Sequence, residues 1–141
     1  MLFYRVETIN NEGPYINTCE LKLMDWLEME GVTDNYGSLY EKYMRDHPSP
    51  LGDDRELYNS FYKDHTMIND YIYGFKSLEQ LNAWFNLKEE KEYLKHYNFF
   101  ISTYKIKTLQ DSFFSSTFQM VAKKESLNLV MREKIWFYKT W

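Results

Sequence analysis

The sequence predicts an α+β fold in which a twisted, mainly antiparallel sheet has helices packed on one face. Segments in which apolar and polar residues alternate predict strands near residues 2–8, 71–75, 99–107, 116–123 and 129–139. Between them, apolar residues recur at helical spacing. No glycine-rich turn joins a strand to a helix, so a doubly wound nucleotide-binding fold is not expected.

Each element of the first half has a local signal. Residues 2–8 alternate and contain aromatic and β-branched residues, which favours a first strand, and the turn-forming residues 10–14 end it. Leucines and methionines then recur at helical spacing up to Gly31, which predicts a helix over about 19–30. A short helix is expected over 38–45. Its buried stripe is predicted to comprise Leu39, Tyr43 and Met44.

A capping pattern begins the first predicted helix of the second half. Ser77 is followed three residues later by Gln80, a spacing at which two side chains satisfy the free amide groups of a helix start. Asn86 and Glu89 repeat the pattern and predict a further helix to about Tyr97. The first of these helices is expected to bury Leu78, Leu81 and Phe85 against the sheet.

The 141 residues are expected to form a single domain with an uneven charge. An acidic, helix- and loop-rich part over about 1–70 holds 6 basic and 14 acidic residues, a net charge of −8. A part with helices and strands over about 71–141 holds 11 basic and 7 acidic residues, a net charge of +4. Because the whole chain is acidic, with a net charge of −4, direct nucleic-acid binding is disfavoured.

Several classes of protein and site are excluded or disfavoured. The single cysteine, Cys19, excludes a disulfide-stapled module and a structural zinc finger, and it predicts a reducing cytosol. No run of 18 apolar residues is present, so no membrane span is expected. A proline-rich turn with aspartate caps explains the acidic loop better than a metal site, and no metal is expected. The residues considered for such a site are Asp46, His47, Asp53, Asp54 and His65.

Four segments in this order resemble a group of small bacteriophage proteins: YRVE at 4–7, GPY at 13–15, HPSP at 47–50 and GFKSLEQLNAWF at 74–85. Small phage proteins of this kind often inhibit host machinery, including CRISPR and other defence systems. The resemblance therefore implies a cytoplasmic protein of an infected bacterium that binds and inhibits a host protein. The chain has no metalloprotease, serine-hydrolase or phosphate-loop motif, which favours action without catalysis and without a cofactor.

An enzymatic alternative rests on Arg5, Ser77 and Gln119. An arginine on a first strand, a serine at the start of a later segment and an acidic or amide residue on a late strand are similar to the ADP-ribosyltransferase pattern. That resemblance implies that Arg5 holds the pyrophosphate of NAD, Ser77 the nicotinamide ribose, and residue 119 the ribose hydroxyl. Gln119 stands where glutamate is usual, and an amide cannot take a proton. The alternative is therefore such an enzyme, or a protein that binds a nucleotide signal.

The partner is expected to be a host protein with a basic surface that binds the acidic half, where tyrosines gather. The predicted contact residues are Tyr36, Tyr40, Tyr43, Asp46, Asp53, Asp54 and Glu56. The competing hypothesis places binding on the basic C-terminal strands around Lys123 and Lys124. The aromatic end of the chain at Trp141 is expected to dock on the body or on a second copy, so a homodimer stays open.

Overall fold

The computed structural model describes residues 1–15, 22–34, 37–48, 53–62, 68–107 and 112–135. These residues form an α+β fold, as predicted. The strands are β1 (Leu2–Glu7), β2 (Tyr71–Gly74), β3 (Phe100–Ile106), β4 (Phe113–Ser115), β5 (Met120–Lys123) and β6 (Leu127–Lys134). The α-helices are α1 (Leu23–Met29), α2 (Ser38–Asp46), α3 (Arg55–Leu57), α4 (Leu78–Trp84) and α5 (Lys88–His96). A π turn at Tyr58–Tyr62 extends α3.

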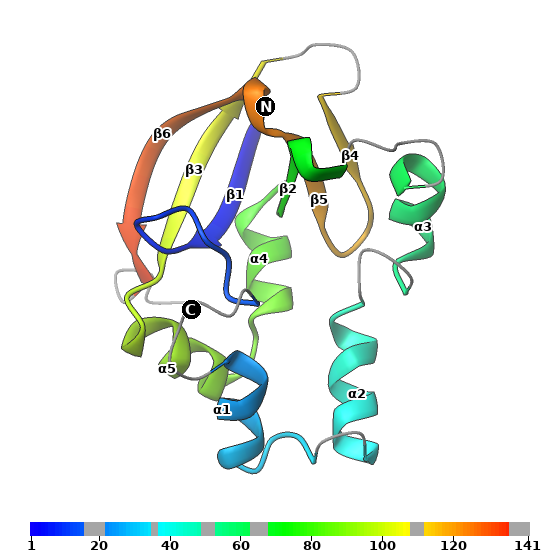
Figure 1. Ribbon diagram of the computed structural model, residues 1–141, viewed down its shortest axis with the longest axis vertical. Helices are drawn as coiled ribbons and strands as arrows, with labels where there is room; N and C mark the ends of the chain where they lie inside the picture. Colours follow the sequence, from blue (N-terminus) through cyan, green and yellow to red (C-terminus); the bar gives the residue numbers. More distant parts are fainter. Residues whose placement is uncertain (16–21, 35–36, 49–52, 63–67, 108–111, 136–141) are drawn as a thin grey trace.

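The strands form two antiparallel sheets instead of the one expected. One sheet has the order β1-β3-β6 and the other β2-β5-β4, and the two lie side by side above α1, α4 and α5 (Figure 1). Within the described residues, one isolated bridge joins them, in which the amides of Tyr4 and Phe75 each donate to the carbonyl of the other, at 2.8 and 2.7 Å. The prediction of one sheet is wrong because β1 and β2 pair at this one point and diverge beyond it.

Gly74 makes this bridge possible. A Cβ atom at Gly74 would lie 2.4 Å from the carbonyl oxygen of Tyr4 and 2.4 Å from the ring of Phe3. Only glycine lets the two backbones approach so closely. The join between the sheets therefore depends on one residue that has no side chain.

Most predicted elements are confirmed, with shifts at their ends. The segment 116–123 is a turn followed by β5, and β4 before it was not predicted, since three residues show no alternation. Part of the helix expected over 19–30, and of the strand expected over 129–139, lies outside the described residues. The second capping pattern begins at Leu87, one residue later than predicted. The amide of Leu87 donates a hydrogen bond to the side chain of Glu90 at 3.1 Å.

The main hydrophobic core fills the space between the β1-β3-β6 sheet and the helices α1, α4 and α5. Leu81 and Phe85 are buried there as predicted, at 0% and 2% exposed, whereas Leu78 is partly buried. Leu39 is 44% exposed, so its predicted burial is wrong, whereas Tyr43 is buried as predicted and Met44 is partly buried. A second core, between the two sheets, comprises Phe3, Tyr104, Ile106, Met120 and Ala122.

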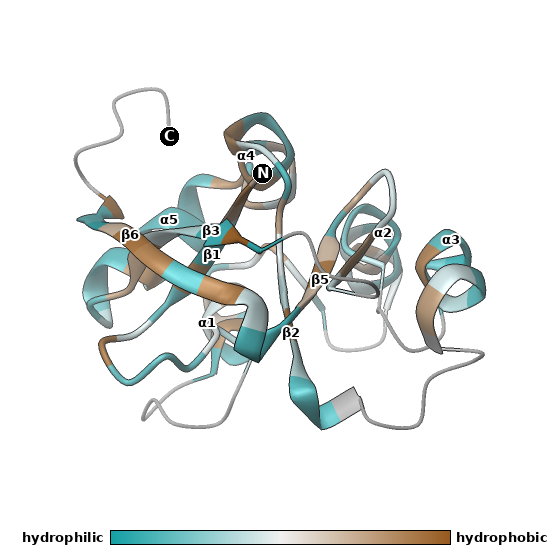
Figure 2. Cartoon of the chain, turned by 90° about the horizontal axis from the view of Figure 1, so that it is seen from above, coloured by the Kyte–Doolittle hydropathy of each residue, from teal (hydrophilic) through white to brown (hydrophobic). Residues whose placement is uncertain are grey.

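The strand β6 forms an edge of its sheet and exposes apolar side chains. Leu129, Val130 and Met131 are 51%, 61% and 45% exposed. Figure 2 shows brown, hydrophobic segments along β6 on the outside of the fold. The pairing with β3 shifts at this point, between Thr103 and Tyr104, which leaves Val130 as the extra residue of a bulge.

Candidate functional site

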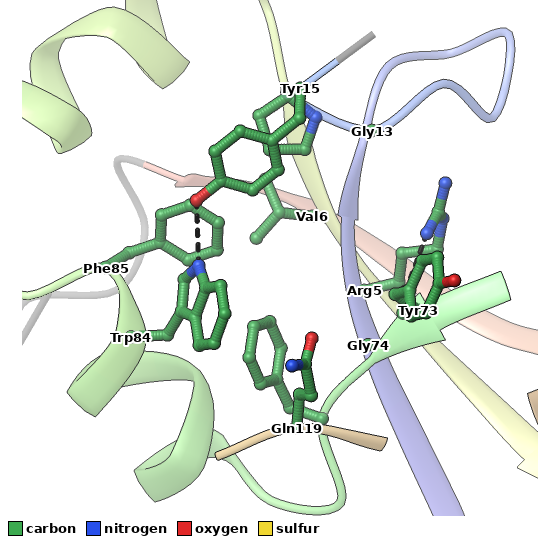
Figure 3. Close-up of a pocket in the computed structure, with 11 residues that line it drawn as sticks. Arg5, Val6, Gly13, Tyr15, Tyr73, Gly74, Trp84, Phe85 and Gln119 are labelled. Carbon is green, nitrogen blue, oxygen red and sulfur yellow. Dashed lines mark hydrogen bonds between the residues drawn. The ribbon is translucent and has the colours of Figure 1, made fainter. Parts of the chain in front are cut away.

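A cavity of about 280 Å³ opens between the two sheets, beside the bridge that joins them. Its walls come from β1, the segment that follows it, β2, the end of α4 and the residue before β5 (Figure 3). Most lining groups are aromatic or aliphatic. A concave, mostly apolar cavity with a few polar groups is typical of a small-molecule site. The lining residues are Arg5, Val6, Gly13, Pro14, Tyr15, Tyr73, Gly74, Phe75, Trp84, Phe85 and Gln119.

Arg5 supplies a cation to one side of the cavity. Its Nε donates to Oε1 of Glu7 at 2.9 Å, and its Nη1 donates to the carbonyl oxygen of Tyr73 at 2.6 Å. No hydrogen bond from Nη2 to another described residue is present, and this atom lies 3.3 Å from the position of a Cβ on Gly13. The guanidinium group is therefore held rigidly in place with donor capacity left over.

The charge of Arg5 is not fully neutralised by its surroundings. Glu7 is completely buried and also accepts hydrogen bonds from the hydroxyl of Tyr104 and, at 3.1 Å, from Nη2 of Arg132. One carboxylate thus faces two guanidinium groups, which leaves the cluster with a net positive charge. Burial raises the pKa of Tyr104, and its hydrogen bond to Glu7 adds to this, so the tyrosine stays a donor. The cluster favours an anionic group beside Arg5.

Gln119 also lines the cavity and is buried, at 3% exposed. Its amide nitrogen donates to Oδ2 of Asp54 and to the carbonyl oxygen of Pro48, both at 3.0 Å. Asp54 is itself fixed, because it accepts hydrogen bonds from Ser116 at 2.6 Å and from the amide of Leu57 at 3.2 Å. These contacts orient the amide of Gln119, and its Oε1 has no hydrogen-bond partner among the residues that the structure describes. Oε1 of Gln119 is therefore available as a hydrogen-bond acceptor for a ligand in the cavity.

Ser77 does not line the cavity. Its hydroxyl accepts a hydrogen bond from the amide of Gln80 at 3.1 Å, so it acts as the predicted N-cap of α4. Gln80 in turn donates to the carbonyl oxygens of Ser116 and Thr117, which ties α4 to the turn before β5. Of the three residues in the ADP-ribosyltransferase pattern, Arg5 and Gln119 therefore share a cavity and Ser77 lies apart from it.

Aromatic rings form the remaining wall. The indole nitrogen of Trp84 donates to the hydroxyl of Tyr15 at 2.8 Å. The ring of Phe75 lies near both neighbours, with its centroid 5.8 Å from that of Trp84 and 6.0 Å from that of Phe85. Such rings provide flat apolar surfaces for a planar ligand group. Figure 3 shows the rings of Tyr15, Trp84 and Phe85 on the side opposite Arg5.

Only some of the residues predicted to contact a partner lie at the surface of the protein. Tyr43 and Asp54 are 5% and 2% exposed, so neither can contact a partner. Tyr43 points inward because its hydroxyl donates to Glu90 at 2.9 Å, and Asp54 points inward because it caps α3. Of the others, Tyr40 is half-buried, Asp46, Asp53 and Glu56 are exposed, and Tyr36 lies outside the described residues.

A shallow depression lies between α2 and the turn that joins β4 to β5. It brings together Tyr40, Met44 and Asp53 with the ring of Phe118, which is 42% exposed. Glu41 and Arg45 line it as well. Two of the predicted contact residues, Tyr40 and Asp53, thus share a surface with an exposed aromatic side chain.

A sequence model of the bacteriophage T4 Y00F protein family matches residues 1–136. The chain belongs to this family. The match spans every residue of the cavity and of the depression, so both belong to the part shared with the family, and it confirms the phage origin that the sequence implied. No curated protein and no solved structure matches the chain.

In this Y00F family member, the acidic loop does not assemble a metal site within the described part of the chain. His47 and Asp54 belong to separate hydrogen-bond networks, and Asp46 and Asp53 are exposed. His65 lies outside the described residues. In the same part of the chain, none of the helices is both long and apolar enough to cross a bilayer.

The aromatic wall was missed as a site, although a signal for it was present. Tyr15 belongs to GPY and Trp84 to GFKSLEQLNAWF, two of the four segments on which the phage resemblance rests. The fold brings these two segments together at the hydrogen bond between Tyr15 and Trp84. A glycine within a strand pattern, Gly74, was a further signal that another backbone comes close.

Proposed function

We propose that this phage protein binds a nucleotide of the ADP-ribose type, of which NAD is one, in the cavity between its two sheets. The single observation that carries the proposal is that Arg5 and Gln119, from opposite ends of the chain, line the same cavity. A cation, an oriented amide and several aromatic rings are the groups that recognise a phosphate, a hydroxyl and a flat base.

Three groups that line the cavity support this proposal, one for each part of such a ligand. Arg5 donates to a phosphate oxygen, since an arginine–phosphate hydrogen bond is charge-assisted. Oε1 of Gln119 accepts from a ribose hydroxyl. A base stacks on the ring of Trp84, and such stacking contributes about 1–3 kcal/mol per base. Because ligand pockets usually measure about 300–1,000 Å³, a cavity of about 280 Å³ suits one nucleoside-sized group, with the phosphates at its mouth beside Arg5.

Binding without group transfer fits the residues better than catalysis. Gln119 has no ionisable group, and its amide nitrogen is already held by Asp54 and Pro48. Ser77 is engaged as a helix cap. The proposal therefore keeps the ligand of the ADP-ribosyltransferase pattern and omits its reaction.

Calorimetry with ADP-ribose and with NAD tests this function. Arg5→Lys keeps a charge beside Glu7 but removes the planar guanidinium group, and affinity is expected to fall at least tenfold. Arg132→Lys is the matched control, because it changes the same Glu7 cluster and does not line the cavity. Equal affinity in both variants, or no binding to the folded wild-type protein, contradicts the proposal. Transfer of label from NAD to host proteins would overturn its non-catalytic part.

A second proposed function is inhibition of a host protein, a CRISPR component or another defence component, in the cytoplasm of the infected bacterium. The depression with Phe118 supports it, because an exposed ring beside a hollow is a common interface anchor. Exposed carboxylates around it suit a partner with a basic surface. They belong to Glu41, Asp46, Asp53 and Glu56, with Lys42, Arg45 and Arg55 among them.

Affinity capture from a host lysate tests this second function. Captured protein is expected to be lost with Phe118→Ser, and its association is expected to slow with Asp46→Lys combined with Asp53→Lys. Lys124→Glu is the control at a residue that does not line the depression. If Lys124→Glu abolishes capture while the acidic variants bind normally, the surface is misplaced.

A further inference from the structure

We propose that His47 and Glu90, neither of which lines the cavity, are positioning residues that set its shape through Trp84 and Tyr15. The identity of the ligand rests on the proposed function. The effect of His47 and Glu90 on the cavity wall does not depend on that identity, and it can be measured on the protein without a ligand.

His47 sits where α2, α4 and α5 meet, at 5% exposed. Its Nδ1 lies 2.8 Å from the carbonyl oxygen of Tyr43, and its Nε2 faces the carbonyl oxygen of Trp84. A carbonyl oxygen can only accept a hydrogen bond, so this arrangement requires a proton on both ring nitrogens. His47 is therefore a buried imidazolium cation in this geometry.

Glu90 provides the matching negative charge. It is completely buried, and its Oε2 lies 3.4 Å from Nε2 of His47 and accepts the hydroxyl of Tyr43 at 2.9 Å. Its Oε1 accepts the amide of Leu87 at 3.1 Å. Loss of the His47 charge would leave Glu90 as an uncompensated buried charge, and breaking a buried ion pair in this way is strongly destabilising.

Two contacts connect this pair to the cavity wall. Trp84 accepts from His47 through its carbonyl oxygen and donates to Tyr15 through its indole nitrogen. Tyr43, which donates to Glu90, also interacts with the hydroxyl of Tyr15. Tyr15 and Trp84 line the cavity, so loss of the His47 proton acts on both of them.

His47 is the titratable group of this cluster whose ordinary pKa, about 6.5, is nearest to neutral. Burial lowers its pKa, but the hydrogen bond and charge of Glu90 and the two carbonyl contacts outweigh burial, and the pKa is raised overall. Burial raises the pKa of Tyr15 and of Tyr43, so both remain protonated. Among the described residues, the titratable groups facing His47 are Tyr43 from α2 and Glu90 from α5, with Tyr15 behind them. The helix α4 faces it with the carbonyl of Trp84.

Fluorine NMR of protein labelled with fluorotryptophan tests the positioning role. The Trp84 signal, assigned with Trp84→Phe, is expected to shift with pH at the same inflection as His47 and to stay constant in His47→Gln. His96→Gln is the matched control, since His96 is an exposed histidine on α5 that lies against Trp26. A Trp84 signal that is constant in the wild type, or that titrates equally in His47→Gln, overturns the inference.

Calorimetry with ADP-ribose separates this inference from the proposed function. Affinity is expected to fall about tenfold as the pH rises through the His47 transition, and to be independent of pH in His47→Gln. If ADP-ribose fails to bind at any pH while Trp84 still titrates, the ligand is wrong and the positioning role stands. If ADP-ribose binds with the same pH dependence in both proteins, the positioning role is wrong and the ligand stands.

Discussion

Gly74 is the residue on which the junction of the two sheets depends. In Gly74→Ala the new Cβ would meet the backbone of Tyr4, which cannot move aside as a side chain can. The free energy of unfolding is expected to fall by about 2–3 kcal/mol or more in urea titrations. Gly13→Ala is the control, because its Cβ meets only the end of the Arg5 side chain. Equal stability of the two variants contradicts this role of Gly74.

The contacts of His47 make the free energy of unfolding depend on pH, and they determine whether it rises or falls as the pH increases. Its pKa is higher in the folded protein than in the unfolded chain. Its contribution is therefore fully present below the unfolded pKa of about 6.5 and is lost as the pH rises through the folded pKa. The difference in the free energy of unfolding between wild type and His47→Gln is expected to shrink over that range. If the difference between the two proteins stays constant from pH 6 to pH 9, this role of His47 is contradicted.

At the scale of elements, α4 shows what local signals predict well. Its cap and its apolar face were both readable from the sequence, because they depend on residues within one turn of each other. Leu81→Ala is expected to lower the free energy of unfolding by roughly 2–5 kcal/mol, since Leu81 is completely buried. Ser77→Ala is expected to cost about 1 kcal/mol. A neutral Leu81→Ala in urea titrations would mean that the buried face is misassigned.

The features that were not predicted depend on residues far apart in the chain. Asp54 was read as a surface carboxylate of a loop, because its partners Ser116 and Gln119 come more than 60 residues later. Tyr43 was predicted both in a buried stripe and among the contact residues, and only its partner Glu90, on another helix, shows that the buried assignment holds. Arg5 and Gln119 were singled out by a family pattern, and only the fold shows that they share a cavity.

For the whole molecule, the acidic and basic halves of the sequence are not separate bodies. The strand β1 of the first half pairs with β3 of the second, and β6 pairs with β3 on its other side. Charge calculated by sequence halves therefore does not map onto two faces, and the acidic surface is local to α2 and its neighbours.

The exposed edge of β6 is relevant to whether the protein forms a homodimer, a question that the sequence leaves open. Three apolar side chains at an unpaired edge favour pairing with a second copy, whereas the bulge at Val130 opposes it. If the edge pairs, the molar mass by light scattering is expected to rise with concentration in the wild type and to stay that of a monomer in Val130→Lys. A monomer at all concentrations in both proteins rules out a β6 dimer.

Chemical-shift mapping with ADP-ribose tests the central claim most directly, namely that the space between the two sheets is a nucleotide site. On titration of the labelled protein, the largest shifts are expected at the amides of Gly13 and Gly74 and at the indole N–H of Trp84. Shifts confined to Tyr40, Asp53 and Phe118 would place the ligand on the other surface. The absence of any shift at millimolar ADP-ribose would contradict the account.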